Sequence, residues 1–216
     1  MMSLERVLMG SALLLLLGSA HAQEGRNIFA QGGSQPGATP CVACHGADGL
    51  GLAAAGFPRL AGLPVGYVRK QLEDFKSGAR SSPVMQPLAK ALTEEEIATV
   101  AQALAVMPAP AVATLHRSVM PDNTAQKIAL QGAWDRQIPA CVSCHGPAGV
   151  GVGEAFPPLA GQPAAYLVAQ LNAWQSGARH NDPNDLMGHI AKSLTAEEVQ
   201  GVATYFSSLS GQEVKP

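Results

Sequence analysis

Apolar residues follow helical spacing in two matching stretches of the chain, residues 64–77 and 163–176. The side chains that form these stripes are Val65, Val68, Leu72 and Phe75 in the first stretch and Tyr166, Leu167, Leu171 and Trp174 in the second. Pro64 suits the first turn of a helix, and Gly78 suits the cap after its last turn. No stretch shows the alternation of a half-buried strand, so the pattern predicts an all-α fold.

Two further helices are predicted from the residues that would begin them. Residues 93–96 (Thr-Glu-Glu-Glu) and 195–198 (Thr-Ala-Glu-Glu) match the capping box, in which a Thr and a Glu three positions later satisfy free backbone N–H groups. We expect these helices to extend to about Met107 and Leu209. A short helix is also expected before each of the two cysteine motifs described below.

The chain is an internal repeat with an offset of about 100 positions. Residues 57–62 (Phe-Pro-Arg-Leu-Ala-Gly) align with residues 156–161 (Phe-Pro-Pro-Leu-Ala-Gly). Residues 77–80 and 176–179 are both Ser-Gly-Ala-Arg. A repeat of this length is much longer than a solenoid unit and predicts two copies of one domain.

The repeat predicts domains at residues 23–107 and 123–216, joined by a linker at residues 108–122. The linker begins Pro-Ala-Pro-Ala, a composition typical of semi-rigid spacers. It continues loosely to the second domain.

The first 22 residues have the organisation of a secretory signal peptide. Arg6 supplies the positive charge, residues 7–17 are mostly apolar, and Ala20-His21-Ala22 is a small-x-small cleavage pattern. Cleavage after Ala22 would place the mature protein in the periplasm. An uncleaved anchor is the alternative, although the apolar run is short for a membrane span.

A Cys-x-x-Cys-His motif occurs once in each repeat, at residues 41–45 and 141–145. Two thiols at this spacing can each form a thioether with a vinyl group of haem, and the adjacent His can become an iron ligand. A redox dithiol needs no following His, and a zinc site would have to gather ligands from both repeats. The motifs therefore predict two covalently attached haem c groups. The residues that would attach the haems or ligate their iron are Cys41, Cys44, His45, Cys141, Cys144 and His145.

The composition of the chain agrees with a buried cofactor, and its charge bears on the choice of partner. The chain has 216 residues, a formal net charge of −2 and 5% aromatic residues. The near-neutral charge argues against a nucleic-acid partner. Domains of under about 100 residues have modest cores, and a porphyrin would supply apolar interior that the few aromatic residues do not.

The second iron ligand in each domain is predicted to be a methionine. Met85 and Met187 are 102 positions apart, which matches the offset of the two following helix starts. Methionine opposite histidine is a common pairing in electron-transfer cytochromes. His180 and His189 are the competing ligands, but neither recurs in the first repeat, so we expect them to be surface residues.

Several residues are candidates for supporting the haem. A backbone carbonyl at Pro58 or Pro157 could accept the ring N–H of the iron-ligating His, or each proline could simply stiffen a loop. Arg80 and Arg179 could pair with haem propionates or be solvated arginines at helix ends. Four aromatic residues are expected to pack on the macrocycle or in the helix core: Tyr67, Tyr166, Phe75 and Trp174.

With these motifs, the chain resembles the dihaem cytochrome c4 family over about residues 24–212. The resemblance implies two tandem class I cytochrome c domains related by a pseudo-twofold axis, with the haems near one another at the interface. It implies His45 with Met85, and His145 with Met187, as axial pairs. The first methionine loop, residues 81–87, departs from the family pattern because it is shorter and lacks Asn-Asp-Pro-Asn.

The resemblance also implies a function, that of a periplasmic electron carrier between respiratory-chain donors and a terminal oxidase. Such a protein is no enzyme, and any membrane association would be through its partners. A second hypothesis is the electron-accepting cytochrome subunit of a periplasmic dehydrogenase. A third is a dihaem peroxidase-like enzyme, which would need an open iron position.

Overall fold

The computed structural model describes residues 23–112 and 120–210. The predicted signal peptide, residues 1–22, lies outside the described residues, as do residues 113–119 of the predicted linker and residues 211–216. Within the described ranges the secondary structure is helical, and strand-type pairing is limited to isolated bridges. The predicted all-α fold of two tandem domains is confirmed.

The helices of the two domains follow the same order. In the first domain, residues 23–31 are helical. The elements that follow are α2 (Val42–His45), η1 (Ala53–Ala55), α3 (Val65–Ser77), α4 (Met85–Ala91) and α5 (Glu94–Ala105). Those of the second domain are α6 (Thr124–Gln131), η2 (Trp134–Arg136), α7 (Cys141–His145), η3 (Pro147–Gly149), α8 (Ala164–Gln175), η4 (Pro183–Asp185), α9 (Leu186–Lys192) and α10 (Ala196–Ser207).

The predicted long helices and their caps are confirmed. In α5, the Thr93 hydroxyl accepts the backbone N–H of Glu96 at 3.1 Å, and the Glu96 carboxylate accepts the N–H of Thr93 at 2.8 Å. Thr195 and Glu198 form the same reciprocal pair at the start of α10. Local hydrogen bonding therefore explains why both helices begin where they do.

Each domain has its own small apolar core, and the cysteine motif lies at the edge of that core. The first core joins α3 and α5 to the helix at residues 23–31, and the second joins α6, α8 and α10. The buried aliphatic residues include Ile28, Ile97, Val100 and Leu104 in the first domain and Ile128, Ile138, Val199 and Val202 in the second. Cys41 packs against the first core and Cys141 against the second.

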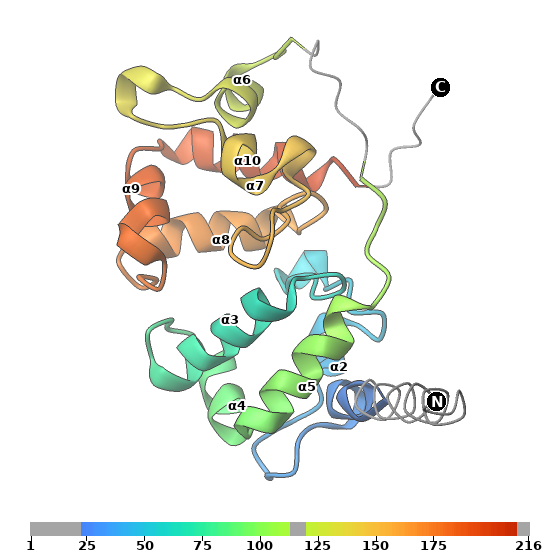
Figure 1. The fold of residues 1–216 in the computed structure, drawn as a ribbon. Helices are drawn as coiled ribbons and strands as arrows, with labels where there is room; N and C mark the ends of the chain where they lie inside the picture. The colour runs from blue at the N-terminus through green and yellow to red at the C-terminus, as the bar shows by residue number, and fades with distance from the viewer. Residues whose placement is uncertain (1–22, 113–119, 211–216) are drawn as a thin grey trace, which may run out of the picture.

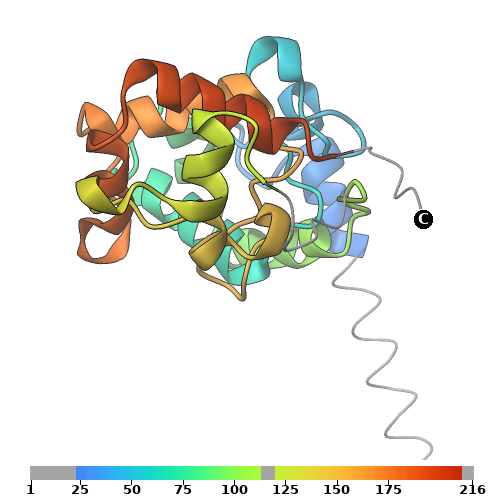
Figure 2. The ribbon, with the colours of Figure 1, turned by 90° about the horizontal axis from the view of Figure 1, so that it is seen from above.

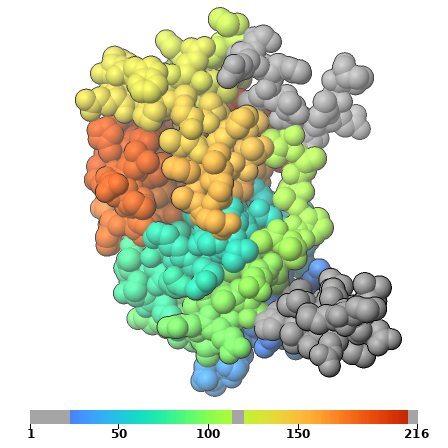
Figure 3. All heavy atoms as spheres, viewed as in Figure 1, coloured from blue at the N-terminus to red at the C-terminus, as the bar shows by residue number. Residues whose placement is uncertain are grey.

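The two domains are stacked, with α3 and α8 facing one another across the interface (Figure 1). The view from above shows the two sets of helices overlapping (Figure 2), and the atoms of the domains meet in a continuous contact (Figure 3). The contacts follow the pseudo-twofold symmetry of the repeat. η1 of the first domain touches α8, while Glu154 of the second domain reaches Gly66 at the start of α3.

Helices α4 and α9 are absent from the predicted pattern. Each has seven residues, which is too few for a clear helical period. They matter because the candidate methionines lie in their first turns. No helix in the described part of the chain is long and apolar enough to cross a membrane.

Candidate functional site

The histidines of the two motifs occupy equivalent buried positions at the ends of α2 and α7. His45 donates its Nδ1–H to the carbonyl of Pro58 at 2.9 Å, and His145 donates to the carbonyl of Pro157 at 2.8 Å. These bonds confirm the prediction of a carbonyl partner at each proline. They place the proton on Nδ1 and leave Nε2 of each ring free to bind a metal.

Burial lowers the pKa of His45 and of His145, and the hydrogen bond to the proline carbonyl only partly opposes this effect. The neutral imidazole is therefore favoured at neutral pH. A neutral ring is the form that binds iron.

A glycine turn after each motif brings the proline carbonyl back to the histidine. The N–H of Gly51 donates to the carbonyl of His45 at 2.8 Å, and Gly151 donates to His145 at 2.7 Å. Gly51 has φ +83°, and an added Cβ would lie 2.4 Å from the carbonyl oxygen of Phe57. A side chain at this position would therefore force the loop away from the histidine.

The four motif cysteines are half-buried, and none forms a disulfide. Burial raises the pKa of the Cys41 and Cys141 thiols to about 11, so both sulfurs are protonated at neutral pH. In the ranges 23–112 and 120–210, no three His, Cys, Asp or Glu side chains group into a metal site. The four sulfurs remain available for thioether bonds.

The candidate methionines occupy equivalent positions at the start of the two short helices. Met85 is the first residue of α4, and Met187 is the second residue of α9; both side chains are half-buried. His180 and His189, the competing ligands, are both exposed. This placement agrees with methionine rather than histidine as the second ligand.

Different side chains hold the two methionine segments. The Ser82 hydroxyl accepts the backbone N–H of Met85 at 3.0 Å. In the second domain, the Asp182 carboxylate accepts the N–H of Met187 at 2.6 Å and the indole N–H of Trp174 at 2.7 Å. The second segment is therefore held by a charged acceptor that is itself tied to α8.

Arg80 and Arg179 are not solvated helix ends. Each is only 6% exposed, because the two domains close over them. Arg80 donates to Gln71 at 2.9 Å and to Gln170 at 2.5 Å, and Arg179 donates to the same two glutamines at 3.0 Å each. Two arginines and two glutamines thus form a symmetric cluster across the interface.

Among the described residues, the two arginines of this cluster form no direct ion pair with a carboxylate. No carboxylate in the described part of the chain lies within ion-pair distance of Arg80 or Arg179. Burial raises the pKa of Tyr166, but the adjacent Arg80 and Arg179 outweigh it and hold that pKa below its ordinary value. The Asp74 carboxylate is linked to the cluster indirectly, through Asn181, which donates to both Gln71 and Asp74. Two buried arginines with one indirectly linked carboxylate leave the cluster positively charged, so it fits a ligand with carboxylates, such as the propionates of haem.

The aromatic residues beside the cluster support these arginines. The guanidinium of Arg80 lies 4.4 Å from the ring centroid of Phe75, and that of Arg179 lies 3.8 Å from the ring of Trp174. The Tyr166 hydroxyl accepts a hydrogen bond from Arg80 at 3.0 Å. Gln71 and Gln170 were not among the predicted site residues, although they occupy matching positions in the repeat.

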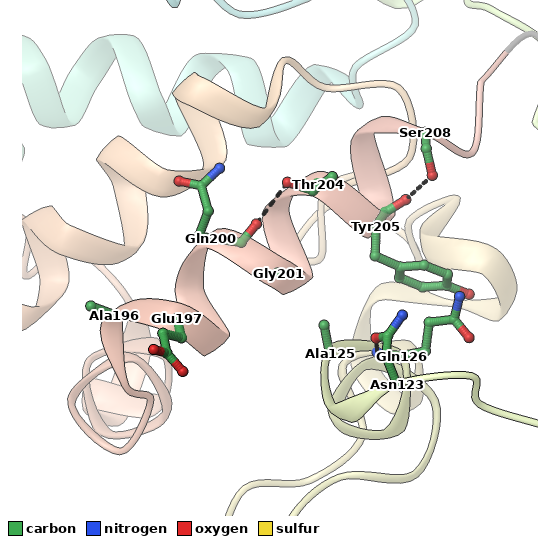
Figure 4. Close-up of a pocket in the computed structure, with 10 residues that line it drawn as sticks. All are labelled: Asn123, Ala125, Gln126, Ala196, Glu197, Gln200, Gly201, Thr204, Tyr205 and Ser208. Carbon is green, nitrogen blue, oxygen red and sulfur yellow. Dashed lines mark hydrogen bonds between the residues drawn. The ribbon is translucent and has the colours of Figure 1, made fainter.

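A separate groove lies beside α6 and α10 (Figure 4). Asn123 and Gln126 line one side of it, and Gln200, Thr204 and Tyr205 line the other. It includes none of the eight predicted haem contacts. The groove is therefore not the haem site.

Comparison with known proteins identifies the fold of both repeats. The family model for cytochrome c matches residues 22–105 and residues 131–210. The two matched regions include both Cys-x-x-Cys-His motifs, both supporting prolines and both candidate methionines.

The proteins similar to this chain include an electron acceptor, a thiosulfate dehydrogenase and a cytochrome c4. A thiosulfate dehydrogenase electron acceptor from Stutzerimonas stutzeri is 57% identical over 99% of this chain and 99% of its own. The structure of thiosulfate dehydrogenase TsdBA from Marichromatium purpuratum matches 87% of this chain with 44% identity and a TM-score of 0.78, and this chain spans 40% of it. Cytochrome c4 from Pseudomonas stutzeri matches 78% of this chain and 93% of its own, with 30% identity and a TM-score of 0.68.

Proposed function

The chain belongs to the cytochrome c family, with two tandem domains of the dihaem cytochrome c4 type, and we propose that it accepts electrons from a thiosulfate dehydrogenase in the periplasm. The observation that carries this proposal is the 57% identity to the acceptor from Stutzerimonas stutzeri over 99% of both chains. A match of that extent includes both domains and the interface between them.

The solved TsdBA structure supports the same partner. A region similar to this chain makes up 40% of that protein, at 44% identity. A cytochrome of this kind therefore occurs in one chain with a thiosulfate dehydrogenase. This favours the hypothesis of a dehydrogenase-linked cytochrome and supports a thiosulfate dehydrogenase as the partner.

The protein residues have distinct roles in this proposal. Each bound haem supplies an iron that takes up and releases one electron. Cys41 and Cys44 attach the first haem, and His45 and Met85 ligate its iron. The second domain uses the equivalent set: Cys141, Cys144, His145 and Met187. Arg80 and Arg179 neutralise propionates at the interface.

Electron transfer needs no open iron position. The site residues fit this requirement, because each domain offers a fixed histidine and a fixed methionine segment as the two iron ligands. The proximal histidines are oriented by carbonyls, and each methionine segment is held by a side-chain acceptor. We propose that electrons leave toward a terminal oxidase, which combines the dehydrogenase-linked role with that of a respiratory carrier. No feature of the described residues favours peroxidase chemistry.

Stopped-flow reduction tests this function. Oxidised holoprotein is mixed with a thiosulfate dehydrogenase and thiosulfate, and the reduced haem absorbance is followed. Controls lack the enzyme or replace this protein with an unrelated monohaem cytochrome c. Enzyme-dependent reduction that is much faster than for the unrelated cytochrome supports the proposal, and equal rates would contradict it.

A further inference from the structure

The peptide that follows the histidine-supporting proline differs between the two domains. In the first domain this peptide joins Pro58 to Arg59, and its carbonyl accepts the ring N–H of His45. The N–H of the same peptide donates to the side-chain oxygen of Gln162 at 3.0 Å. Gln162 belongs to the second domain, so this hydrogen-bond chain crosses the interface.

The orientation of Gln162 is fixed by a second bond. Its side-chain N–H donates to the carbonyl of Arg59 at 2.9 Å, so only one orientation of the amide satisfies both partners. Gln162 is 4% exposed and Arg59 is 3% exposed. The Arg59 guanidinium also donates to the carbonyls of Ala61 and Ala160, which ties this segment to both domains.

The second domain has no equivalent of this chain. There the peptide joins Pro157 to Pro158, and Pro158 has no N–H to donate. The position that corresponds to Gln162 in the first domain is Leu63, which has no polar side chain. The carbonyl of Pro157 therefore supports His145 without help from the other domain.

A peptide that donates through its N–H becomes a stronger acceptor at its carbonyl, because hydrogen bonds in a chain polarise one another. A stronger acceptor on Nδ1–H makes the histidine a more basic metal ligand. From these two effects and the contacts above we infer that Gln162 is a positioning residue for His45, through which the second domain tunes the haem of the first domain alone. The inference rests on the proposed ligation of iron by His45.

The direction of the effect follows from ligand basicity. A more basic histidine stabilises ferric iron over ferrous iron and so lowers the reduction potential. Removing the bond between Arg59 and Gln162 is therefore expected to raise the potential of the haem in the first domain (haem 1). The potential of the haem in the second domain (haem 2) is expected to be unchanged, because the Pro157 carbonyl that supports His145 does not depend on this bond.

Substitutions at Arg59 isolate the peptide N–H. Arg59→Pro and Arg59→Ala both remove the guanidinium and its charge, but only Arg59→Pro removes the N–H. Proline is compatible with the position because Pro158 occupies it in the second domain. The difference between the two variants therefore reports the hydrogen bond rather than the charge.

The readout is an NMR redox titration of the holoproteins, in which the methyl resonances of each haem titrate separately. We expect haem 1 in Arg59→Pro to have a higher midpoint than in Arg59→Ala, so that its reduced-to-oxidised ratio at a fixed potential rises several-fold. Haem 2 should have the same midpoint in both. Equal haem 1 midpoints, or equal shifts in both haems, would overturn the inference.

A second pair of variants tests the inference even if Arg59→Pro does not fold. Gln162→Leu introduces the residue type found at the equivalent position of the first domain, Leu63, and should raise the haem 1 midpoint. Glu154→Ala removes a different bond across the interface, the one to the N–H of Gly66, and should leave that midpoint unchanged. Equal effects of the two variants would overturn the inference. A haem 1 that is not low-spin in the unaltered protein would instead contradict the proposed ligation.

Discussion

The two domains share the direct bond that orients each motif histidine and differ in the bonds that hold each methionine segment. The His45 and His145 bonds to their proline carbonyls are 2.9 and 2.8 Å long. The methionine segments, in contrast, are held by a neutral hydroxyl in the first domain and by a carboxylate in the second. The repeat thus preserves the direct bond from histidine to the proline carbonyl. It varies the peptide behind that carbonyl and the side chains that hold the proposed second ligand.

Two copies of one domain therefore need not hold their methionine segments equally firmly. Hydrogen bonds to a charged acceptor are stronger than bonds to a neutral one. The Asp182 carboxylate accepts hydrogen bonds from the backbone N–H groups of Met187 and Gly188 and from the indole N–H of Trp174. We therefore expect Met187 to be the more secure ligand and Met85 the more easily displaced one.

The largest expected effect comes from removing a motif cysteine. Cys144→Ala should leave haem 2 on one thioether or unattached, while haem 1 stays fully attached. Cys44→Ala is the matched variant and should affect haem 1 alone. Intact-chain mass under denaturing conditions counts the attached haems. Two fully attached haems in either variant would refute the assignment of the motif.

Replacing the methionines should have the next largest effect. Met187→Ala should lower the potential of haem 2 and allow added imidazole to bind. It should also abolish the contribution of haem 2 to the weak far-red absorption band that methionine-ligated ferric haem shows. Met85→Ala should do the same at haem 1. Absorption spectra and redox titration measure these changes. A variant with an unaltered spectrum and potential would show that its methionine is not a ligand.

Replacing the side chains that accept hydrogen bonds from the methionine segments should have a smaller effect, and one that differs between the domains. Asp182→Ala removes three hydrogen bonds to a carboxylate, and we expect it to lower the free energy of unfolding by about 2 kcal/mol. Ser82→Ala removes one neutral bond near a helix start and should cost about 1 kcal/mol or less. Urea unfolding of the holoproteins measures both.

Ligand competition sharpens the same comparison. In the unaltered protein, imidazole should displace Met85 at a lower concentration than Met187. Asp182→Ala should remove much of that difference, whereas Ser82→Ala should enlarge it. A larger loss of stability in Ser82→Ala than in Asp182→Ala would contradict our account of the two segments.

The smallest expected effect is a pH dependence at the start of α10. Arg136 donates two hydrogen bonds to Glu198, and this pairing is the main reason that the pKa of Glu198 lies below its ordinary value. A depressed carboxyl pKa stabilises the fold at neutral pH, and this contribution is lost as pH falls through the folded-state pKa. Glu198→Gln should therefore lower stability at pH 7.

Below the ordinary carboxyl pKa of about 4.3, the difference between Glu198→Gln and the unaltered protein should shrink. Unfolding curves measured across this pH range test the sign. Arg136→Ala is the companion variant and should reduce the same acid dependence. A stability difference that grows toward low pH would contradict the assignment.

Features set by local sequence could be predicted well. The Thr93 and Thr195 caps depend on residues three positions away, and the His45 bond to Pro58 lies within one loop of the motif. These contacts are local, so the residue types and their spacing are enough to place them. The family resemblance, which is now confirmed, added the overall arrangement of two helical domains.

Features set by packing between the domains could not be predicted. Arg80 and Arg179 lie just beyond the ends of α3 and α8, where an arginine is commonly exposed, and only the approach of the other domain buries them. The role of Gln162 could not be predicted for the same reason, because its partner Arg59 lies 103 positions away in the sequence. The matching Gln71 and Gln170 were a signal in the repeat, since an equivalent polar residue on two facing helices suggests a shared interface.

We expect this chain to bind two haems, with each iron ligated by one histidine and one methionine. A quantitative absorption spectrum of oxidised and reduced protein, matured in a periplasm, tests this expectation most directly. We expect two covalent haems per chain and a far-red band of two-haem intensity. Half of that band, or a high-spin component, would show that one iron position is open and would contradict the account.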